Sequence, residues 1–173
     1  SLPVRAVKGD AEAKSREEWE KAVARPAVRG PRPASLSCVP ALVVEDEAGA
    51  RELITITLEQ QGAVVTDVDS AAAALAALES QLEGGAARAP FDVLISDIGM
   101  PGGDGYELIR RVRSHTDKRV SGIRAVALTA YARTEDRMQA LRAGFQMHVP
   151  KPVDEAELTT VIAALTGRTP GQD

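Results

Sequence analysis

The sequence predicts an α/β fold in which helices cover both faces of a five-stranded, doubly wound parallel sheet of order 2-1-3-4-5. From Val39 onward, apolar runs of strand length alternate five times with amphipathic stretches of helix length. A polar residue stands at the expected end of four of the five strands. The chain has 173 residues, of which 44% are hydrophobic, and this is enough to build the core of such a domain.

Five short apolar runs are the expected strands. Most are rich in Val, Ile, Leu or Ala, and all are shorter than a typical helix. Because a helical stretch separates each run from the next, we expect parallel pairing with right-handed crossovers. In chain order the runs are Ala41–Val44, Ala63–Val65, Val93–Ile95, Ile123–Leu128 and Gln146–Val149.

The first two helices are expected between the first three strands. The first covers Ala48–Gln61 and stops at Gly62, and Ser70 can cap the second. The apolar residues expected to face the core are Leu53, Ile54 and Leu58 in the first helix and Leu75, Leu78 and Leu82 in the second.

Three further helices follow the third, fourth and fifth strands. The fourth helix covers Thr134–Ala143 and stops at Gly144. The third and fifth each begin with an acidic capping pattern, Asp104 with Glu107 and Asp154 with Glu157. The core-facing residues predicted for these two helices are Leu108, Ile109 and Val112, then Leu158, Val161, Ile162 and Leu165.

The first 38 residues differ in composition and are expected to form a leader and linker. Asp10–Arg25 has helix-forming composition with i,i+4 charge pairs, and the proline-containing residues 26–35 predict an extended linker. We therefore expect the α/β domain to cover residues 39–167, followed by a C-terminal tail at 168–173.

Composition bounds the partners and the location. Lys and Arg total 21 against 25 Asp and Glu, and aromatic residues are 3%, which disfavours a nucleic-acid partner. No apolar run approaches the roughly 20 residues that span a bilayer, and no signal peptide is visible. The single cysteine excludes an internal disulfide. We expect a cytoplasmic segment without membrane contact.

The polar residues at the strand ends are expected to meet at one edge of the sheet. Glu45 and Asp46 follow the first strand, Asp97 the third, Thr129 the fourth and Lys151 the fifth. In this strand order, strands one and three flank the switch point where such sheets bind ligands. Three carboxylates would therefore crowd one crevice.

That crowding predicts a cation and a phosphoryl group. Like charges at close range oppose joint ionisation, and Mg²⁺ suits a site with few oxygen ligands. With a fixed charge from Lys151 and a hydroxyl from Thr129, such a site could hold a phosphoryl group. Asp97 is the best-placed nucleophile, since Asp can form an acyl phosphate.

Four motifs resemble those of receiver domains, the response regulator domains of two-component signalling. They are LVVEDE (42–47), LISDIGMPGGDG (94–105), ALTAYA (127–132) and VPKPVD (149–154), and the similarity covers roughly residues 39–167. The resemblance implies a flavodoxin-like fold and a phosphoacceptor switch in a phosphorelay. It also implies that Asp97 is phosphorylated by phosphohistidine and that Lys151 pairs with the phosphoryl group.

The resemblance further assigns metal and switch residues. Glu45, Asp46, Asp97 and the backbone carbonyl of Gly99 would bind Mg²⁺. Thr129 would move toward the phosphoryl group together with His148, which stands where such domains often carry Tyr or Phe. The Lys151–Pro152 bond would be cis, and the output surface would be the fourth helix, fifth strand and fifth helix.

This chain departs from the usual pattern near the site. Glu45 replaces the commoner Asp, and its longer arm could reach the metal through water. Gly99 and Tyr131 occupy the two positions that tune dephosphorylation in this family. The lifetime of the phosphoryl group therefore does not follow from the resemblance.

The start of the chain, SLPVRAV, is similar to the closing strand of the ATP-binding domain of sensor histidine kinases. This implies the C-terminal receiver of a hybrid histidine kinase. The partner would be a histidine kinase dimerisation/phosphotransfer domain or a histidine phosphotransfer protein. A free-standing regulator with an extension is the alternative. The segment carries no ATP-binding glycine motif and no phosphoacceptor-histidine helix, so by itself it is not a kinase.

Two other functions remain open at this point. An Mg²⁺-dependent phosphohydrolase of the haloacid dehalogenase type also uses an aspartyl nucleophile, but it needs a second Asp where this chain has Gly99. A pseudo-receiver would dock partners without phosphorylation, but it would usually lack an acid or the lysine, and both are present here.

Overall fold

The computed structural model describes residues 35–83, 91–101, 105–130 and 133–168. These residues form a single parallel sheet with the strand order β2-β1-β3-β4-β5, as the sequence predicts. The predicted leader helix at 10–25 and the capping residue Asp104 lie outside the described residues. The strands are β1 (Pro40–Val44), β2 (Val64–Val68), β3 (Val93–Asp97), β4 (Arg124–Thr129) and β5 (Met147–Pro150).

The described residues contain six helices, one more than the sequence analysis expected. They are α2 (Ala48–Gln60), α3 (Ala71–Glu83), α4 (Gly105–Arg113), α5 (Lys118–Ser121), α6 (Thr134–Ala143) and α7 (Glu155–Leu165). The additional helix, α5, has four residues and begins after Asp117, whose carboxylate accepts a hydrogen bond from the Arg119 N–H. A single turn shows no apolar periodicity, and for this reason it was not predicted.

The predicted helix ends are largely confirmed. Ser70 Oγ accepts from the Ala73 N–H at 3.2 Å, and Asp154 Oδ1 accepts from the Glu157 N–H at 2.8 Å. Helix α6 covers the predicted residues and ends at Gly144, whose φ of 126° lies in the left-handed region that favours glycine.

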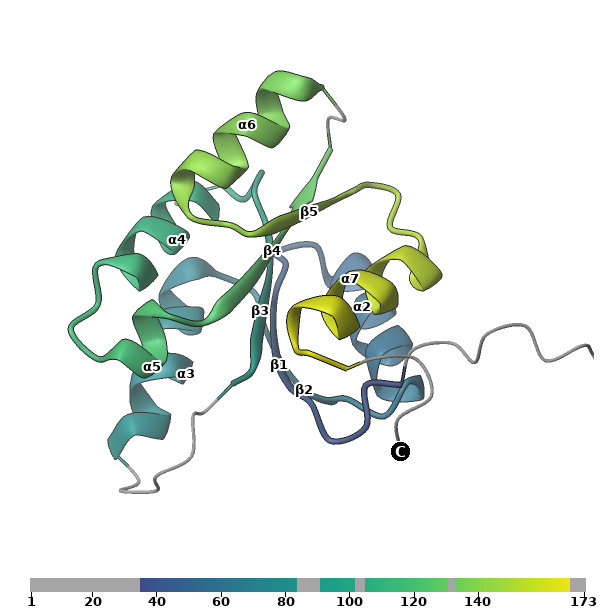
Figure 1. Cartoon of the computed structure of the whole chain (residues 1–173), viewed down its shortest axis with the longest axis horizontal. Coiled ribbons are helices and arrows are strands. Elements are labelled where there is room, and N and C mark those ends of the chain that lie inside the picture. Colours follow the sequence, from purple (N-terminus) through teal and green to yellow (C-terminus); the bar gives the residue numbers. More distant parts are fainter. Residues whose placement is uncertain (1–34, 84–90, 102–104, 131–132, 169–173) are drawn as a thin grey trace, which may run out of the picture. The chain divides into compact units, whose positions relative to one another are not determined.

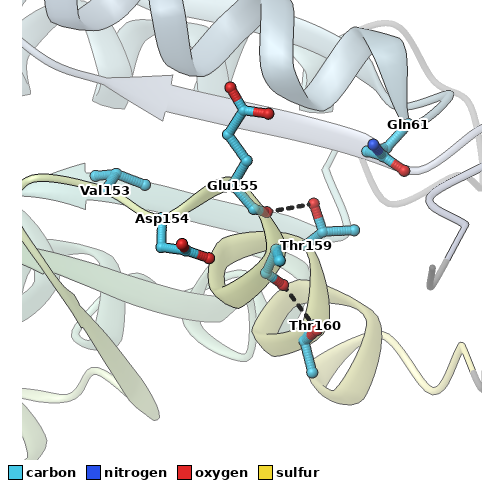
Figure 2. A pocket seen from close by; sticks show the side chains of 7 residues that line it. Gln61, Val153, Asp154, Glu155, Thr159 and Thr160 are labelled. Atoms are coloured by element: carbon cyan, nitrogen blue, oxygen red, sulfur yellow. Dashed lines mark hydrogen bonds between the residues drawn. The ribbon is translucent and has the colours of Figure 1, made fainter. Parts of the chain in front are cut away.

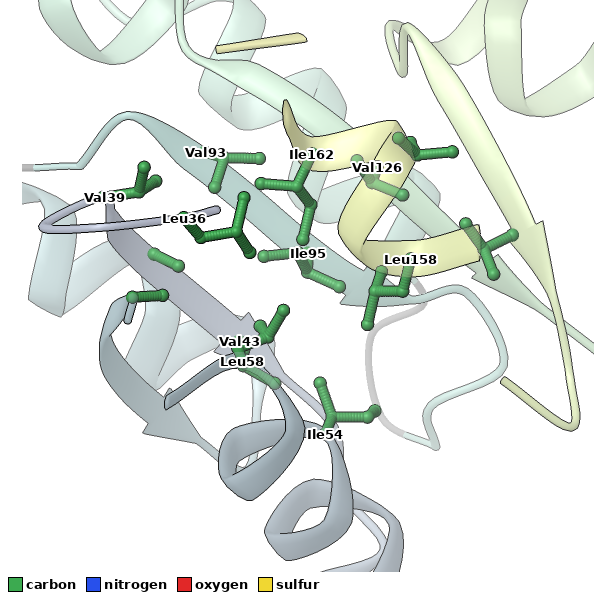
Figure 3. Close-up of a cluster of buried hydrophobic side chains, with 14 of the residues drawn as sticks. Leu36, Val39, Val43, Ile54, Leu58, Val93, Ile95, Val126, Leu158 and Ile162 are labelled. Carbon is green, nitrogen blue, oxygen red and sulfur yellow. The ribbon is translucent and has the colours of Figure 1, made fainter. Parts of the chain in front are cut away.

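The helices form two layers, one on each face of the sheet (Figure 1). Successive side chains of a strand point to opposite faces, so each central strand contributes to both cores. On one face, α2 and α7 pack against the sheet through residues such as Ile54, Leu58, Leu158 and Ile162 (Figure 3). On the other face, α3, α4, α5 and α6 cover a second cluster. Each fully buried Leu or Ile contributes about 1.5–3 kcal/mol.

Two details of the sequence analysis need correction. Leu53, expected on the inner face of α2, is 58% exposed, because Ile54, Thr57 and Leu58 form the buried stripe. Strand β2 begins one residue later than predicted and continues to Val68. It is an edge strand, and its polar Thr66 and Asp67 obscured the apolar pattern.

Candidate functional site

The parallel sheet brings the predicted polar residues to one edge. Glu45 and Asp46 follow β1, and Asp97 is the last residue of β3. Thr129 ends β4 and pairs in register with Pro150 of β5. The next residue, Lys151, donates its backbone N–H to the Thr129 carbonyl at 2.7 Å. All four strand-end positions therefore lie at the carboxyl edge of the sheet, where the parallel strands end.

The three carboxylates converge as expected. Each offers one oxygen, and these oxygens all lie within 4.8 Å of one another. Glu45 and Asp97 are buried, with 1% and 6% of their surfaces exposed, whereas Asp46 is exposed. A compact set of carboxylate oxygens with one open side is the donor set that a hard divalent cation prefers.

Lys151 supplies the positive charge between the two buried acids. Its Nζ lies 2.7 Å from Glu45 Oε2 and 3.1 Å from Asp97 Oδ2. Burial raises the pKa of the Glu45 carboxyl, because the hydrogen bond from Lys151 offsets only part of the desolvation. Burial alone would lower the pKa of Lys151, but hydrogen bonds to Glu45 and Asp97 outweigh it and the pKa is raised. The ammonium therefore stays charged beside Asp97.

The turn after β3 fixes the other side of Asp97. The Gly99 N–H donates to Asp97 Oδ1 at 3.1 Å. The Gly105 N–H donates to the Ile98 carbonyl at 3.0 Å, and a Cβ on Gly105 would collide with the backbone oxygen of Asp97. This close approach explains why a glycine begins α4 where the helix passes the backbone of Asp97 and Ile98.

Thr129 carries a buried hydroxyl without a hydrogen-bond partner among the described residues. The residue is 4% exposed and lines a pocket of about 330 Å³ beside the turn after β3. The half-buried His148 pairs in register with Ala127, two residues before Thr129, so the two side chains share one face of the sheet. The Lys151–Pro152 bond is cis, as the resemblance implies.

The sequence analysis missed two residues, Glu47 and Arg51, that shape the loop between β1 and α2. The Glu47 carboxylate caps α2 by accepting from the N–H groups of Gly49 and Ala50, at 3.0 and 2.6 Å. Arg51 donates to the Glu45 carbonyl at 2.9 Å and pairs with Asp67 at 3.2 Å. Glu is not a common capping residue and Asp67 is distant in sequence, so neither contact left a recognisable pattern.

A larger pocket of about 560 Å³ lies between the end of α2 and the start of α7 and contains none of the strand-end residues. Figure 2 shows its polar lining. The hydroxyls of Thr159 and Thr160 already donate to backbone carbonyls of the same helix, at 2.8 and 2.7 Å. The carboxyl edge of the sheet, where the strand-end residues meet, is therefore the better candidate site.

Comparisons with known proteins agree with this geometry. A family model described as the response regulator receiver domain matches residues 41–163. The chain is 44% identical over 121 residues to an uncharacterized 14.6 kDa protein of Leptolyngbya boryana, over 70% of this chain and 85% of that protein. It is 32% identical over 127 residues to the sensor histidine kinase GacS of Pseudomonas protegens, over 73% of this chain. The match spans 13% of GacS.

The fold also matches a solved structure. The chemotaxis response regulator CheY4 of Vibrio cholerae aligns with a TM-score of 0.63 at 25% identity, over 75% of this chain and 99% of that one. In the described part of the chain, no helix combines the length and apolar character required to cross a bilayer.

Proposed function

Because this chain belongs to the family of response regulator receiver domains, the phosphoacceptor switches of two-component signalling, we propose that Asp97 accepts the phosphoryl group. The observation that carries the proposal is the convergence on this side chain. The Lys151 ammonium lies 3.1 Å from one oxygen of Asp97, and oxygens of two further carboxylates lie within 4.8 Å.

In the proposed reaction, an oxygen of the Asp97 carboxylate attacks the phosphorus of a phosphohistidine. A P–O bond forms as the P–N bond breaks, and the departing imidazole nitrogen takes up a proton from solvent. Lys151 neutralises charge on the phosphoryl oxygens, and Thr129 offers them its unpartnered hydroxyl. Positioning and charge neutralisation are the main demands of such a transfer.

The acidic group fits the Mg²⁺ that receiver domains bind. Glu45, Asp46, Asp97 and the Gly99 carbonyl are the proposed ligands, and both oxygens of Glu45 already accept hydrogen bonds, from Lys151 and from the Glu47 N–H. Both oxygens of Asp97 also accept hydrogen bonds, from the Gly99 N–H and from Lys151, each at 3.1 Å. Glu45 is more deeply buried than Asp97 and lies closer to the Lys151 ammonium, at 2.7 Å. We therefore propose that Asp46 and Asp97 are direct ligands and that Glu45 binds through water. When bound, Mg²⁺ would offset the charge that gathers on the phosphoryl oxygens.

The proposed output follows from Thr129 and its neighbours. Movement of its hydroxyl toward the phosphoryl group would vacate space on the face that it shares with His148. The helix α6 and the strand β5 follow Thr129 directly in the chain, and together with the helix α7 they are the proposed output surface. Met138 and Leu141 of α6 are exposed apolar side chains that a partner could cover.

The phosphodonor proposed for Asp97 is a histidine kinase dimerisation/phosphotransfer domain or a histidine phosphotransfer protein. The relative GacS is named a sensor histidine kinase, and this favours a hybrid histidine kinase as the parent protein. In the proposed arrangement, residues 39–167 are a cytoplasmic receiver domain with a leader before it and a short tail after it. Because the match spans 13% of GacS, sequencing the gene upstream of Ser1 is the direct test of this arrangement.

Replacing Asp97 with Asn tests the acceptor directly. Asn keeps the size of the side chain but removes the nucleophilic carboxylate, so we expect phosphorylation by a small-molecule donor with Mg²⁺ to be lost. Phosphate-affinity electrophoresis measures the modified fraction.

The matched control for this experiment is Asp92→Asn, which changes an acid beside the opposite end of β3. This variant should label like the unaltered chain. Equal labelling of the Asp97→Asn variant would show that the acceptor is a different residue.

A further inference from the structure

Arg113, the last residue of α4, holds three backbone carbonyls at once. Its Nε and Nη2 donate to the Gly144 carbonyl at 3.0 and 2.8 Å. Its Nη1 donates to the carbonyls of Ser121 and Ile123 at 2.7 and 2.6 Å. One guanidinium thus joins the end of α4 to the end of α5, the start of β4 and the end of α6.

The charge of Arg113 is held by dipoles rather than by an acid. None of the described carboxylates lies within ion-pair distance of it, and burial lowers the pKa of the guanidinium, which nonetheless stays protonated. Carbonyls at helix C-termini lack intrahelical donors and carry partial negative charge, so they favour a cation. The contact satisfies several such groups with one side chain.

The corner between α6 and β5 is built around this contact. A Cβ on Gly144 would lie 2.9 Å from Arg113 Cγ and 3.3 Å from Ile109 Cγ1, so the corner packs directly on α4. The Gln146 backbone N–H donates to the Ala125 carbonyl, and its side chain accepts from the Ala125 N–H at 2.8 Å. This end of α6 is therefore fixed to two neighbouring elements.

The opposite end of α6 is held much less firmly. Its N-cap, Arg133, makes no side-chain capping bond, and Ala140 is the one buried residue of the helix. Asp136 and Gln139 line the pocket of about 330 Å³ that they share with Thr129. An element with little buried apolar surface beside a cavity can move at low cost.

We infer that Arg113 is the positioning residue that fixes the C-terminal end of α6, so that the response to phosphorylation is confined to the end beside Thr129. The confinement of the response to phosphorylation rests on the proposed function, whereas the anchoring of α6 by Arg113 does not. Arg113 is the last residue of α4, which begins at Gly105, so it lies at the end of this helix away from the acidic site and acts through the α6–β5 corner.

Amide hydrogen exchange and NMR on the full chain test the inference with Arg113→Met and Arg113→Lys. Without any ligand, the amides of residues 145–147 should exchange at least about tenfold faster in the Met variant, because four hydrogen bonds are lost. The Lys variant keeps the charge and should recover part of the protection. Arg110→Met, an exposed site on the same helix, is the matched control and should not change the exchange.

Beryllofluoride with Mg²⁺ then tests the confinement of the response. In the unaltered chain, we expect beryllofluoride to change amide chemical shifts mainly at residues 134–139. In the Arg113→Met variant, we expect these shift changes to extend through residue 147. The affinity for beryllofluoride should differ between the two chains by less than about threefold. Unaltered corner exchange in both Arg113 variants would overturn the inference. If the Met variant fails to fold, faster corner exchange in the Lys variant supports the anchor and unchanged exchange refutes it. Absence of beryllofluoride binding by the unaltered chain counts against the proposed function, and the exchange comparison still decides the anchor.

Discussion

Two acidic side chains show how their surroundings set ionisation in opposite directions. Glu45 is buried, and desolvation raises the pKa of its carboxyl. Asp117 lies at the surface, where hydrogen bonds from the Arg119 side chain and backbone lower the pKa of its carboxyl to about 2. Burial opposes the charged form and hydrogen bonds to a carboxylate favour it, so the stronger influence decides each case.

Asp117 gives a prediction for the pH dependence of stability. Because its pKa falls from 3.8 to about 2 on folding, its stabilising effect is complete above the unfolded value and is lost as the pH falls from about 4 to about 2. Carboxyl-detected NMR at pH 3 should find Asp117 ionised in the folded chain and mainly protonated in urea. With Arg119→Ala, the titration should move toward 3.8, and an unmoved titration would contradict the role given to the arginine.

Helix α2 shows why a sequence pattern locates a helix better than it selects the buried face. Leu53, Ile54 and Leu58 are all apolar and within two turns, and the pattern placed all three inside. In the structure, Ile54 and Leu58 are buried against the sheet and Leu53 is exposed. Adjacent residues differ by about 100° around a helix, so the packing partner decides between them.

The two leucines of α2 provide a stability prediction at the level of the element. Leu58→Ala removes a side chain with no exposed surface and should lower the free energy of unfolding by about 2–5 kcal/mol. Leu53→Ala should change it by less than about 0.5 kcal/mol. Denaturant unfolding of the two variants measures the difference, and equal losses would mean that α2 packs through another face.

The N-terminal boundary of the domain depends on contacts made by residues that precede β1 in the sequence. Leu36 is fully buried in the core beneath α2 and α7, and its N–H donates to the Gln61 carbonyl at 2.9 Å. The Cys38 N–H donates to the Gly62 carbonyl at the same distance. The segment at residues 36–38 therefore closes one end of the hydrophobic core.

Truncation measures what that segment contributes to the domain. We expect the free energy of unfolding to be about 2–5 kcal/mol higher for a chain that begins at Ser35 than for a chain that begins at Val39. The shorter chain lacks Leu36 and therefore exposes the core that this side chain covers. Leu36→Ala in the full chain should lose a similar amount, and Ser37→Ala, at an exposed site, should lose little. Equal stability of the two truncated chains would place the domain boundary at residue 39.

The sequence by itself determined the order of the five strands and of the helices other than α5, the parallel sheet, and the set of strand-end residues that meet at the candidate site. These follow from local signals: apolar period, capping side chains such as Ser70 and Asp154, and glycine stops such as Gly144. The tertiary structure alone decided which groups pair. Glu45 bonds Lys151 across 106 residues of sequence, and Arg113 reaches a carbonyl 31 residues away. Such contacts depend on how the layers pack, which no local pattern encodes.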